Sequence, residues 1–502
     1  MNRRSVVSVL AIVILAMLAW SVVVPVAAQE PTGNMIPLDH PFAAFLESRA
    51  YGASLGATPE FNKMEWVVVD EANKRLYMSM SDITGAMTDG EGEISVDENR
   101  CGIVYTAELS DDFTMTEMRP LVVGGPFNPD GAPNRCDVNN ISNPDGAALD
   151  AMGRLWIAED SSNHRNNMLW VYDPADGSLK RFGYTPRGAE WTGPYIAENG
   201  TLFFSNQHPN ATNLYPYNAG TVFAVVGFNA NTDSFEEIAV PEGDAQLMAD
   251  VAAGELQVIA RSGDPIPNSF TGDVFGGIYR PDGSLQYVNN DPDGLMWLPV
   301  GDGNQGWLYI NYEGIAGGVG RVFLQMTEDG SYEVLDGQMV DFSGVNGTWT
   351  NCGSSVTPWN TGLTSEEYEP IASDFANVDG MTDWLGAPAN PYDYGWLVEL
   401  APDGVTDEVT KRYALGRFSH EIAWVIDGEE VNVVYHGDDG ANVMLFRSVT
   451  EEAGDLSTAT LYAGAVTQLG GTGADHYFQI EWIELGTATD ADIEAAIREL
   501  DR

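Results

Sequence analysis

Basic residues are scarce in this sequence. Lysine and arginine together number 23, against 74 aspartates and glutamates, so the 502 residues carry a formal net charge of −51 at pH 7. Such a surface repels nucleic-acid phosphates, which argues against nucleic acid as a partner. Two explanations of the charge stay open: a solubilising surface for a salty medium, where charges are screened within about 10 Å, and carboxylates that bind cations. An anionic substrate would call for bound cations.

Cysteine is almost absent, and its odd count is informative. The three cysteines are Cys101, Cys136 and Cys352, so in an exported protein at least one thiol is unpaired or forms an intermolecular bond. Cys101 and Cys136 flank one segment and could pair with each other. Cys352 is then free, and it is either buried and inert or a metal ligand.

Long apolar runs are absent beyond the N-terminus. The one such run, residues 6–24, follows two arginines and precedes small residues at 26–28. This order predicts a cleaved signal peptide over residues 1–28, a secreted or periplasmic protein and no stable membrane span after cleavage. The arginine pair matches a twin-arginine signal poorly, so Sec export is favoured over Tat export. An uncleaved anchor is the alternative, because the run approaches the roughly 20 residues that span a bilayer.

Glycine and proline, in contrast, are abundant. The 54 glycines, 26 prolines and 10% aromatic residues accompany apolar runs that Asp-Gly or Asn-Gly pairs interrupt about every ten residues, a pattern typical of short strands and tight turns. A unit of aspartate, glycine and short apolar strand recurs, as propeller blades do. It appears at residues 150–157, 173–179, 282–287 and 302–310.

These observations predict an all-β fold in which residues 29–502 form one β-propeller of six blades with insertions. A β-sandwich would need several copies joined by linkers, and no linker is visible. A C-terminal helix is expected over residues 490–500, with Thr487 or Thr489 as its N-cap. Residues 230–275 are ambiguous between a helix and a long insertion.

Polar side chains that can bind metals gather beside five predicted strand starts. In a propeller the innermost strand of each blade starts near the central axis, so distant clusters can converge there. Any single carboxylate is more typical of a solvated surface, and Asn-Pro-Asp-Gly at 143–146 is also a common turn sequence. The clusters are residues 62–66 with Lys63 and Glu65; 143–160 with Asp145; 188–209 with Glu190 and His208; 351–367 with Asn351, Cys352, Glu366 and Glu367; and 415–439 with Arg417, His420, Glu421, Asp438 and Asp439.

Taken together, these clusters resemble the PhoX-type alkaline phosphatases, a family of exported propeller enzymes. Residues 352–367 and 415–421 are the most diagnostic, and 289–291 and 311–313 resemble two further family segments. The resemblance covers nearly the whole mature chain and implies hydrolysis of small phosphate monoesters with Fe(III) and Ca²⁺ as cofactors. The cysteine block follows the Glu65 block here, whereas the family has the reverse order, which indicates a circular permutation.

The resemblance also implies roles for individual residues. Cys352, Glu421 and Glu65 match the family's iron ligands, and Lys63 falls where the family has a phosphate-binding arginine. Lysine lacks the bidentate fork of arginine, so weaker phosphate binding or a changed substrate preference is expected. Tyr312 likewise replaces the family's histidine. Further implied metal ligands are Glu190, Glu366, Glu367, Asp145 and Asp438, with Arg417 as a second catalytic cation and His420, His208 and Asn351 as residues that support the ligands.

Two other functions are compatible with the sequence. Asn-Pro-Asp-Gly followed by Gly-Arg-Leu-Trp-Ile suggests a calcium-dependent, lactonase-like propeller, which would not need Cys352. A non-catalytic extracellular propeller that binds a protein or glycan would show no phosphatase activity with any metal.

Overall fold

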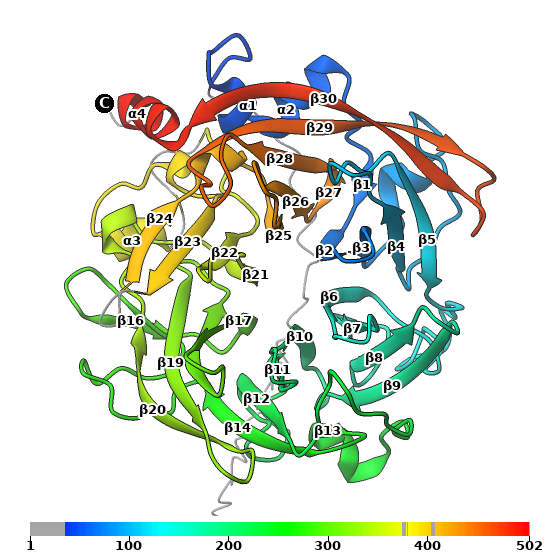
Figure 1. Ribbon diagram of the computed structural model, residues 1–502, viewed down its shortest axis with the longest axis vertical. Helices are drawn as coiled ribbons and strands as arrows, with labels where there is room; N and C mark the ends of the chain where they lie inside the picture. The colour runs from blue at the N-terminus through cyan, green and yellow to red at the C-terminus, as the bar shows by residue number, and fades with distance from the viewer. Residues whose placement is uncertain (1–35, 374–377, 379, 403–406, 501–502) are drawn as a thin grey trace, which may run out of the picture. The chain divides into compact units, whose positions relative to one another are not determined.

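Antiparallel sheets follow one another along the chain and surround a common centre (Figure 1). The computed structural model describes residues 36–373, 378, 380–402 and 407–500. The first strands of the sheets contact one another in a closed cyclic order, from β2 to β6, β10, β17, β21, β25 and back to β2. These inner strands are β2 (Met64–Asp70), β6 (Pro144–Leu149), β10 (Glu190–Ile196), β17 (Pro292–Val300), β21 (Asn351–Val356) and β25 (His420–Ile426). The predicted six-bladed all-β propeller is therefore confirmed.

Each blade adds further strands outside its inner strand. After β2 come β3 (Arg75–Met80), β4 (Ile103–Glu108) and β5 (Glu117–Val123); after β6 come β7 (Leu155–Glu159), β8 (Met168–Asp173), β9 (Ser178–Tyr184) and β13 (Asp250–Val251). After β10 come β11 (Leu202–Gln207), β12 (Thr221–Val226) and β14 (Glu255–Arg261); after β17 come β18 (Gln305–Tyr312), β19 (Gly318–Met326) and β20 (Tyr332–Met339). After β21 come β22 (Gly362–Glu366), β23 (Leu397–Pro402) and β24 (Asp407–Lys411); after β25 come β26 (Val433–Asp438), β28 (Phe446–Thr450), β29 (Thr458–Leu469) and β30 (Tyr477–Thr489).

Short elements fill the connections. A small two-stranded sheet pairs β1 (Phe61–Asn62) with the distant β27 (Ala441–Val443), and a hairpin pairs β15 (Gly277–Tyr279) with β16 (Leu285–Val288). The α-helices are α1 (Ala43–Leu46), α2 (Ser48–Leu55), α3 (Met381–Leu385) and α4 (Asp490–Leu500). The 3₁₀ turns are η1 (Gly85–Thr88), η2 (Gly243–Leu247), η3 (Ser343–Val345), η4 (Pro391–Asp393) and η5 (Tyr413–Leu415).

The ring closes between the last blade and the first. The long strand β30 pairs with the outer strand β5 through Phe478↔Met118 and Gln479↔Glu117, which joins both blades into one nine-stranded sheet. Helices α1, α2 and α4 pack along β30 (Figure 1). Main-chain pairing across the closure removes exposed strand edges that would otherwise invite aggregation.

Aromatic side chains fill the spaces between blades. Trp156 and Phe182 of the second blade share one buried cluster with Trp191 and Phe204 of the third, and the rings of Trp191 and Phe204 stack with centroids 4.1 Å apart. Close to the axis the inner strands approach more tightly. A Cβ at Gly353 would collide with the carbonyl oxygen of Glu421 in the next inner strand, so glycine is required there.

The cysteines, the C-terminal helix and residues 230–275 were left open by the sequence, and the structure describes all three. Cys101 and Cys136 form a disulfide, and Cys352 is a buried free thiol. Thr489 accepts a hydrogen bond from the Asp492 N–H and is the N-cap of α4. Residues 230–275 contain η2, β13 and β14 and no α-helix.

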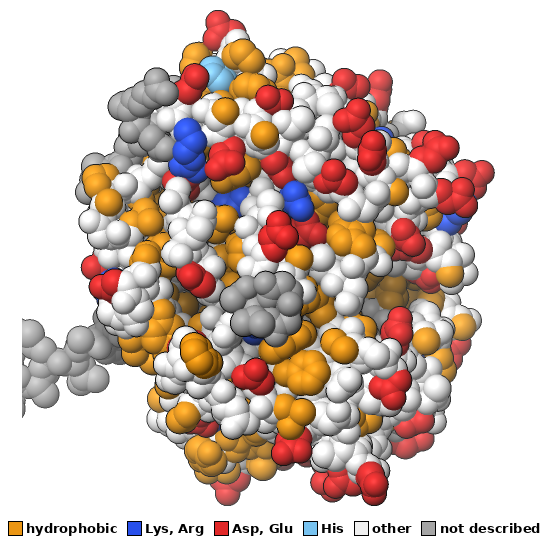
Figure 2. All heavy atoms as spheres, turned by 60° about the vertical axis from the view of Figure 1, so that its left-hand side comes forward, with side chains coloured by type: hydrophobic (Ala, Val, Ile, Leu, Met, Phe, Trp, Pro, Cys, Tyr) orange, Lys and Arg blue, Asp and Glu red, His pale blue; other side chains and the backbone are white. Residues whose placement is uncertain are grey.

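The predicted signal peptide, residues 1–28, lies outside the described residues. No helix in the described part of the chain is long and apolar enough to cross a membrane. Figure 2 shows acidic side chains scattered over one face with few basic ones between them. This distribution fits the solubilising explanation for much of the negative charge.

Candidate metal centre

The inner strands aim a ring of acidic or thiol side chains at the centre of the propeller. In five blades the residue concerned is the second of its strand, and the inner strand bulges there: β2 pairs through Met64↔Met80 and resumes only at Val67↔Met78. A bulge inserts an extra residue and re-aims its side chain. The five residues at these bulges are Glu65, Asp145, Asp293, Cys352 and Glu421. In the remaining blade, Glu190 begins β10.

A second ring comes from the other strand of each inner pair. Because the pairing is antiparallel, the end of each second strand lies beside the start of its inner strand. The residues that directly follow the second strands β3, β7, β11, β18, β22 and β26 are Ser81, Asp160, His208, Glu313, Glu367 and Asp439. The two rings therefore place predominantly acidic residues from all six blades at one end of the propeller axis.

Four groups within these rings bring their ligand atoms within 4.8 Å of one another. Three of the groups are continuous, because Cys352 and Glu421 each belong to two of them. Cys352 Sγ lies 3.2 Å from both carboxylate oxygens of Glu421 and 3.4 Å from Asp293 Oδ2. The groups are Asp293, Glu313 and Cys352; Cys352, Glu367 and Glu421; Glu65, Glu421 and Asp439; and Asp145, Asp160 and Glu190.

Burial and mutual repulsion disfavour the charged forms of these ligands. Burial, together with the negative charges of Asp145 and Glu65, raises the pKa of Glu421 well above its usual value. Burial and the charges of Asp293 and Glu313 likewise raise the pKa of the Cys352 thiol. A bound cation would reverse both effects, because it favours the deprotonated ligand.

The chemistry of the donors fits metal ions. Asp145 Oδ1 and Asp439 Oδ1 are buried and accept no hydrogen bond from any described residue, so each oxygen is free to bind a cation. The three continuous groups combine one thiol with carboxylates, whereas Asp145, Asp160 and Glu190 offer oxygen alone. Oxygen-only sets suit hard cations such as calcium, and a thiolate adds a ligand that suits transition metals.

A lysine, a tyrosine and a histidine stand at the edge of these groups. Lys63 Nζ lies 2.6 Å from Asp439 Oδ2 and 2.9 Å from the hydroxyl of Tyr368, with 36% of its side chain exposed. His208 Nδ1 lies 2.8 Å from Asp291 and Nε2 lies 4.0 Å from Glu190. All three have left-handed φ angles of 48–53°, which cost energy outside glycine and recur at functional sites.

Two carboxylates expected as ligands face away from the centre. Both Glu366 and Asp438 end their strands, so alternation points them opposite to Glu367 and Asp439. Glu366 accepts hydrogen bonds from Lys411 Nζ at 3.0 Å and from the N–H groups of Gly395 and Trp396. Asp438 pairs with Arg49 of α2. Neither belongs to the four groups, whereas the expected Cys352, Glu421, Glu65, Glu190, Glu367 and Asp145 all do.

The Glu366–Lys411 ion pair gives a stability prediction, since both side chains are fully buried. Lys411→Met should lower the free energy of unfolding by about 3–5 kcal/mol, because it leaves a buried carboxylate without its cation. The double variant Glu366→Gln/Lys411→Met should recover most of this loss. Chemical denaturation of both variants measures it, and a single variant as stable as the wild type would contradict the assignment.

The other expected residues have structural surroundings. Arg417 is buried, and its guanidinium donates to the carbonyl oxygens of Tyr394, Pro370 and Pro391, so the expected catalytic cation is committed to the backbone. His420 donates its Nε2–H to Gly416 O and packs on Phe418. Asn351 precedes Cys352 and bonds with Thr348 and Thr364.

Sequence reasoning missed Asp293, Glu313 and Asp160 as members of the four groups. For Asp293 a signal was available: Pro292-Asp293-Gly294 repeats Pro144-Asp145-Gly146 at the start of another inner strand. In both places the glycine lets the neighbouring inner strand come close. Glu313 and Asp160 lack such a signature, because they are recognisable only as residues that directly follow a second strand.

Comparisons with known proteins identify the family of this chain. The family model of alkaline phosphatase PhoX matches residues 24–210 and 324–500, and no curated protein matches the chain. Pseudomonas fluorescens PhoX, solved in complex with vanadate, is 19% identical with a TM-score of 0.32, over 42% of this chain and 53% of that one. The alignment thus spans about half the length of that structure.

Two further similar structures have lower sequence identities to this chain. TolB from Acinetobacter baumannii is 10% identical with a TM-score of 0.34, over 88% of this chain and 69% of that one. The polysaccharide lyase Uly1 is 14% identical with a TM-score of 0.33, over 84% and 77%. The circular permutation stays a prediction.

The family model matches most of the length of this chain, so the chain belongs to the alkaline phosphatase PhoX family.

Proposed function

We propose that this protein is an exported, metal-dependent alkaline phosphatase that hydrolyses phosphate monoesters and releases inorganic phosphate. The observation that carries the proposal is the continuous set of ligands around Cys352 and Glu421, in a chain of the PhoX family. Export rests on the N-terminal sequence pattern, residues 1–28.

The cofactors we propose are Fe(III) and Ca²⁺. Cys352, Glu421 and Glu65, with their neighbours Glu367 and Asp439, would hold iron, and Asp145, Asp160 and Glu190 would hold calcium. Cations bound there would supply the positive charge that stabilises a phosphoryl group during transfer. This positive charge is needed, because the protein's own net charge of −51 would otherwise repel the ester.

Basic side chains at the edge of the site would bind and orient the substrate. The Lys63 ammonium can donate to a phosphoryl oxygen, and Tyr368 and Asp439 restrict where that ammonium lies. Burial alone would lower the pKa of His208, but the hydrogen bond and charge of Asp291 outweigh it and raise the pKa to about 9. The Asp291 contact at Nδ1 leaves Nε2–H of a protonated His208 as a second donor.

The test pairs metal analysis with a hydrolysis assay on the natively exported protein. Iron and calcium in the purified protein, with calcium-dependent hydrolysis of a chromogenic phosphate monoester, is the expected result. Calcium without iron, and no hydrolysis, would overturn the proposal and favour the lactonase-like or binding propeller.

A further inference from the structure

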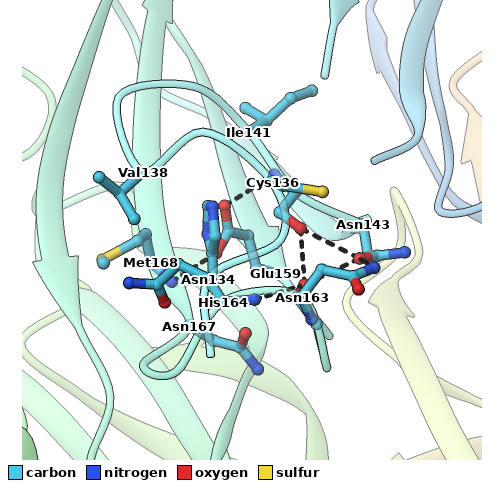
Figure 3. A network of polar contacts seen from close by, with 12 residues as sticks. Asn134, Cys136, Val138, Ile141, Asn143, Glu159, Asn163, His164, Asn167 and Met168 are labelled. Carbon is cyan, nitrogen blue, oxygen red and sulfur yellow. Dashed lines mark hydrogen bonds and ion pairs between the residues drawn. The ribbon is translucent and has the colours of Figure 1, made fainter. Parts of the chain in front are cut away.

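A closed circuit of bonds lies beside the Asp145, Asp160 and Glu190 group, and Figure 3 shows three of its members, Cys136, Asn143 and Asn163. The Asn143 side-chain oxygen accepts a hydrogen bond from Asn163 Nδ2 at 3.1 Å. The Asn143 N–H donates to Cys101 O at 2.8 Å, and the Cys136 N–H donates to Asn163 O at 3.3 Å. The Cys101–Cys136 disulfide completes the circuit, so one covalent bond and three hydrogen bonds link four residues.

This circuit is attached to two of the three carboxylates. Asn143 stands two residues before Asp145, and its carbonyl oxygen accepts the N–H of Asp160 at 3.2 Å. Its side-chain amide also donates to Ser81 O at 2.8 Å, which reaches the first blade. Asn143 has a left-handed φ of 47°, a conformation that asparagine tolerates better than most residues. Asn143 thus fixes the main-chain positions from which the side chains of Asp145 and Asp160 extend.

A buried glutamate holds the loop that follows Asp160. Both oxygens of Glu159 are occupied: one accepts from the Ser142 N–H and Trp170 Nε1, the other from the Met168 N–H and His164 Nδ1. These partners lie just before β6, within the loop and in β8, and Figure 3 labels Glu159 with His164 and Met168. The loop therefore has little freedom to move Asp160 independently of Asn143.

The group of three carboxylates has an independent sign of a ligand. Gln207 is 1% exposed, and neither atom of its amide has a hydrogen-bond partner among the described residues. Gln207 lies opposite Glu190 in the ladder between β10 and β11, so the two side chains share one face of the sheet. A buried amide without a partner is costly, and a cation that also binds Glu190 would satisfy its oxygen.

The structure assigns to Asn143 and the Cys101–Cys136 disulfide a shared role: they are a clamp that positions Asp145 and Asp160 and so sets the affinity of this group for a divalent cation. The clamp does not touch the groups around Cys352. It rests on the cation-binding part of the proposed function and is independent of ester hydrolysis.

The test is calorimetric titration of chelator-treated protein with calcium. Asp145→Asn identifies which binding step belongs to this group. Asn143→Gly keeps the left-handed backbone but removes the amide, and Asn163→Ala removes its partner with little risk to folding. Each should weaken that step about 10- to 100-fold, as loss of an outer-shell partner does, and Cys101→Ser/Cys136→Ser should act in the same direction.

Asn268→Gly is the matched control, because Asn268 also has a left-handed φ, of 56°, and one side-chain hydrogen bond, to Leu335 O. It should bind calcium as the wild type does. If Asp145→Asn also binds calcium like the wild type, the cation assignment of the group is wrong and the clamp falls with it. If Asp145→Asn loses a step that Asn163→Ala and Asn143→Gly retain at wild-type affinity, the clamp alone is wrong.

Discussion

Cys352→Ser is expected to lower kcat for a phosphate monoester about 1,000-fold and to remove most of the bound iron. Cys352 belongs to two of the three continuous groups, so its loss weakens both. A serine hydroxyl is neutral at working pH, whereas a thiolate offsets the charge of the cation. A metal ion contributes several kcal/mol of charge stabilisation during phosphoryl transfer, and each 1.4 kcal/mol is a factor of ten in rate.

The measurement is kcat with a chromogenic ester beside iron content by elemental analysis. Ser354→Ala is a suitable control, because Ser354 lies two residues further along the same buried strand and outside the four groups. Its kcat and iron content should match those of the wild type. A Cys352→Ser protein with full phosphatase activity would refute the iron assignment, because hydrolysis of the ester would then not need the thiolate.

Much of the site was predictable because strand starts are visible in a sequence. Glu65, Asp145 and Glu421 stand directly before or within short apolar runs, and a propeller brings such positions together whatever their separation along the chain. The Pro-Asp-Gly sequence that contains Asp145 recurs around Asp293, and in both blades it marks the start of an inner strand.

Where two acidic residues are adjacent, the sequence does not show which of them faces the centre. The two members of Glu366-Glu367, and of Asp438-Asp439, are chemically alike. Yet the second member of each pair faces the centre, whereas the first forms an ion pair with a cationic side chain. Only the register of the strand decides between them, since a shift of one residue exchanges the two faces. Sequence alone does not fix that register at a bulge.

Arg417 shows a different limit. A guanidinium beside a diagnostic motif was expected to bind phosphate, but three backbone carbonyls of the segment 370–394 occupy it. Which backbone groups are left without partners depends on how irregular connections fold, and no local pattern near residue 417 reveals that. The same connections place Tyr368 against Lys63, a contact between residues 305 positions apart.

Lys63→Ala should lower kcat/KM for a phosphate monoester about 10- to 100-fold, mainly through KM. The lost contact is a hydrogen bond from a charged donor, worth about 1.5–3 kcal/mol. Lys63→Arg should retain or improve kcat/KM, because a guanidinium can hold two phosphoryl oxygens at once. Tyr368→Phe should cause a smaller rise in KM, because it frees the ammonium without removing it.

Lys74→Ala is the matched control for Lys63→Ala. Lys74 also has a left-handed φ, of 50°, and an ion pair with an aspartate, Asp111, but it lies in the turn between β2 and β3, at the end of the strand opposite Lys63. Both alanines therefore have a similar left-handed backbone and lose an ion pair with an aspartate, which is buried for Lys63 and exposed for Lys74. Equal kinetics in the two variants would mean that Lys63 does not touch the substrate; a loss confined to Lys63→Ala, reversed by Lys63→Arg, would place the phosphoryl group at the Lys63 ammonium.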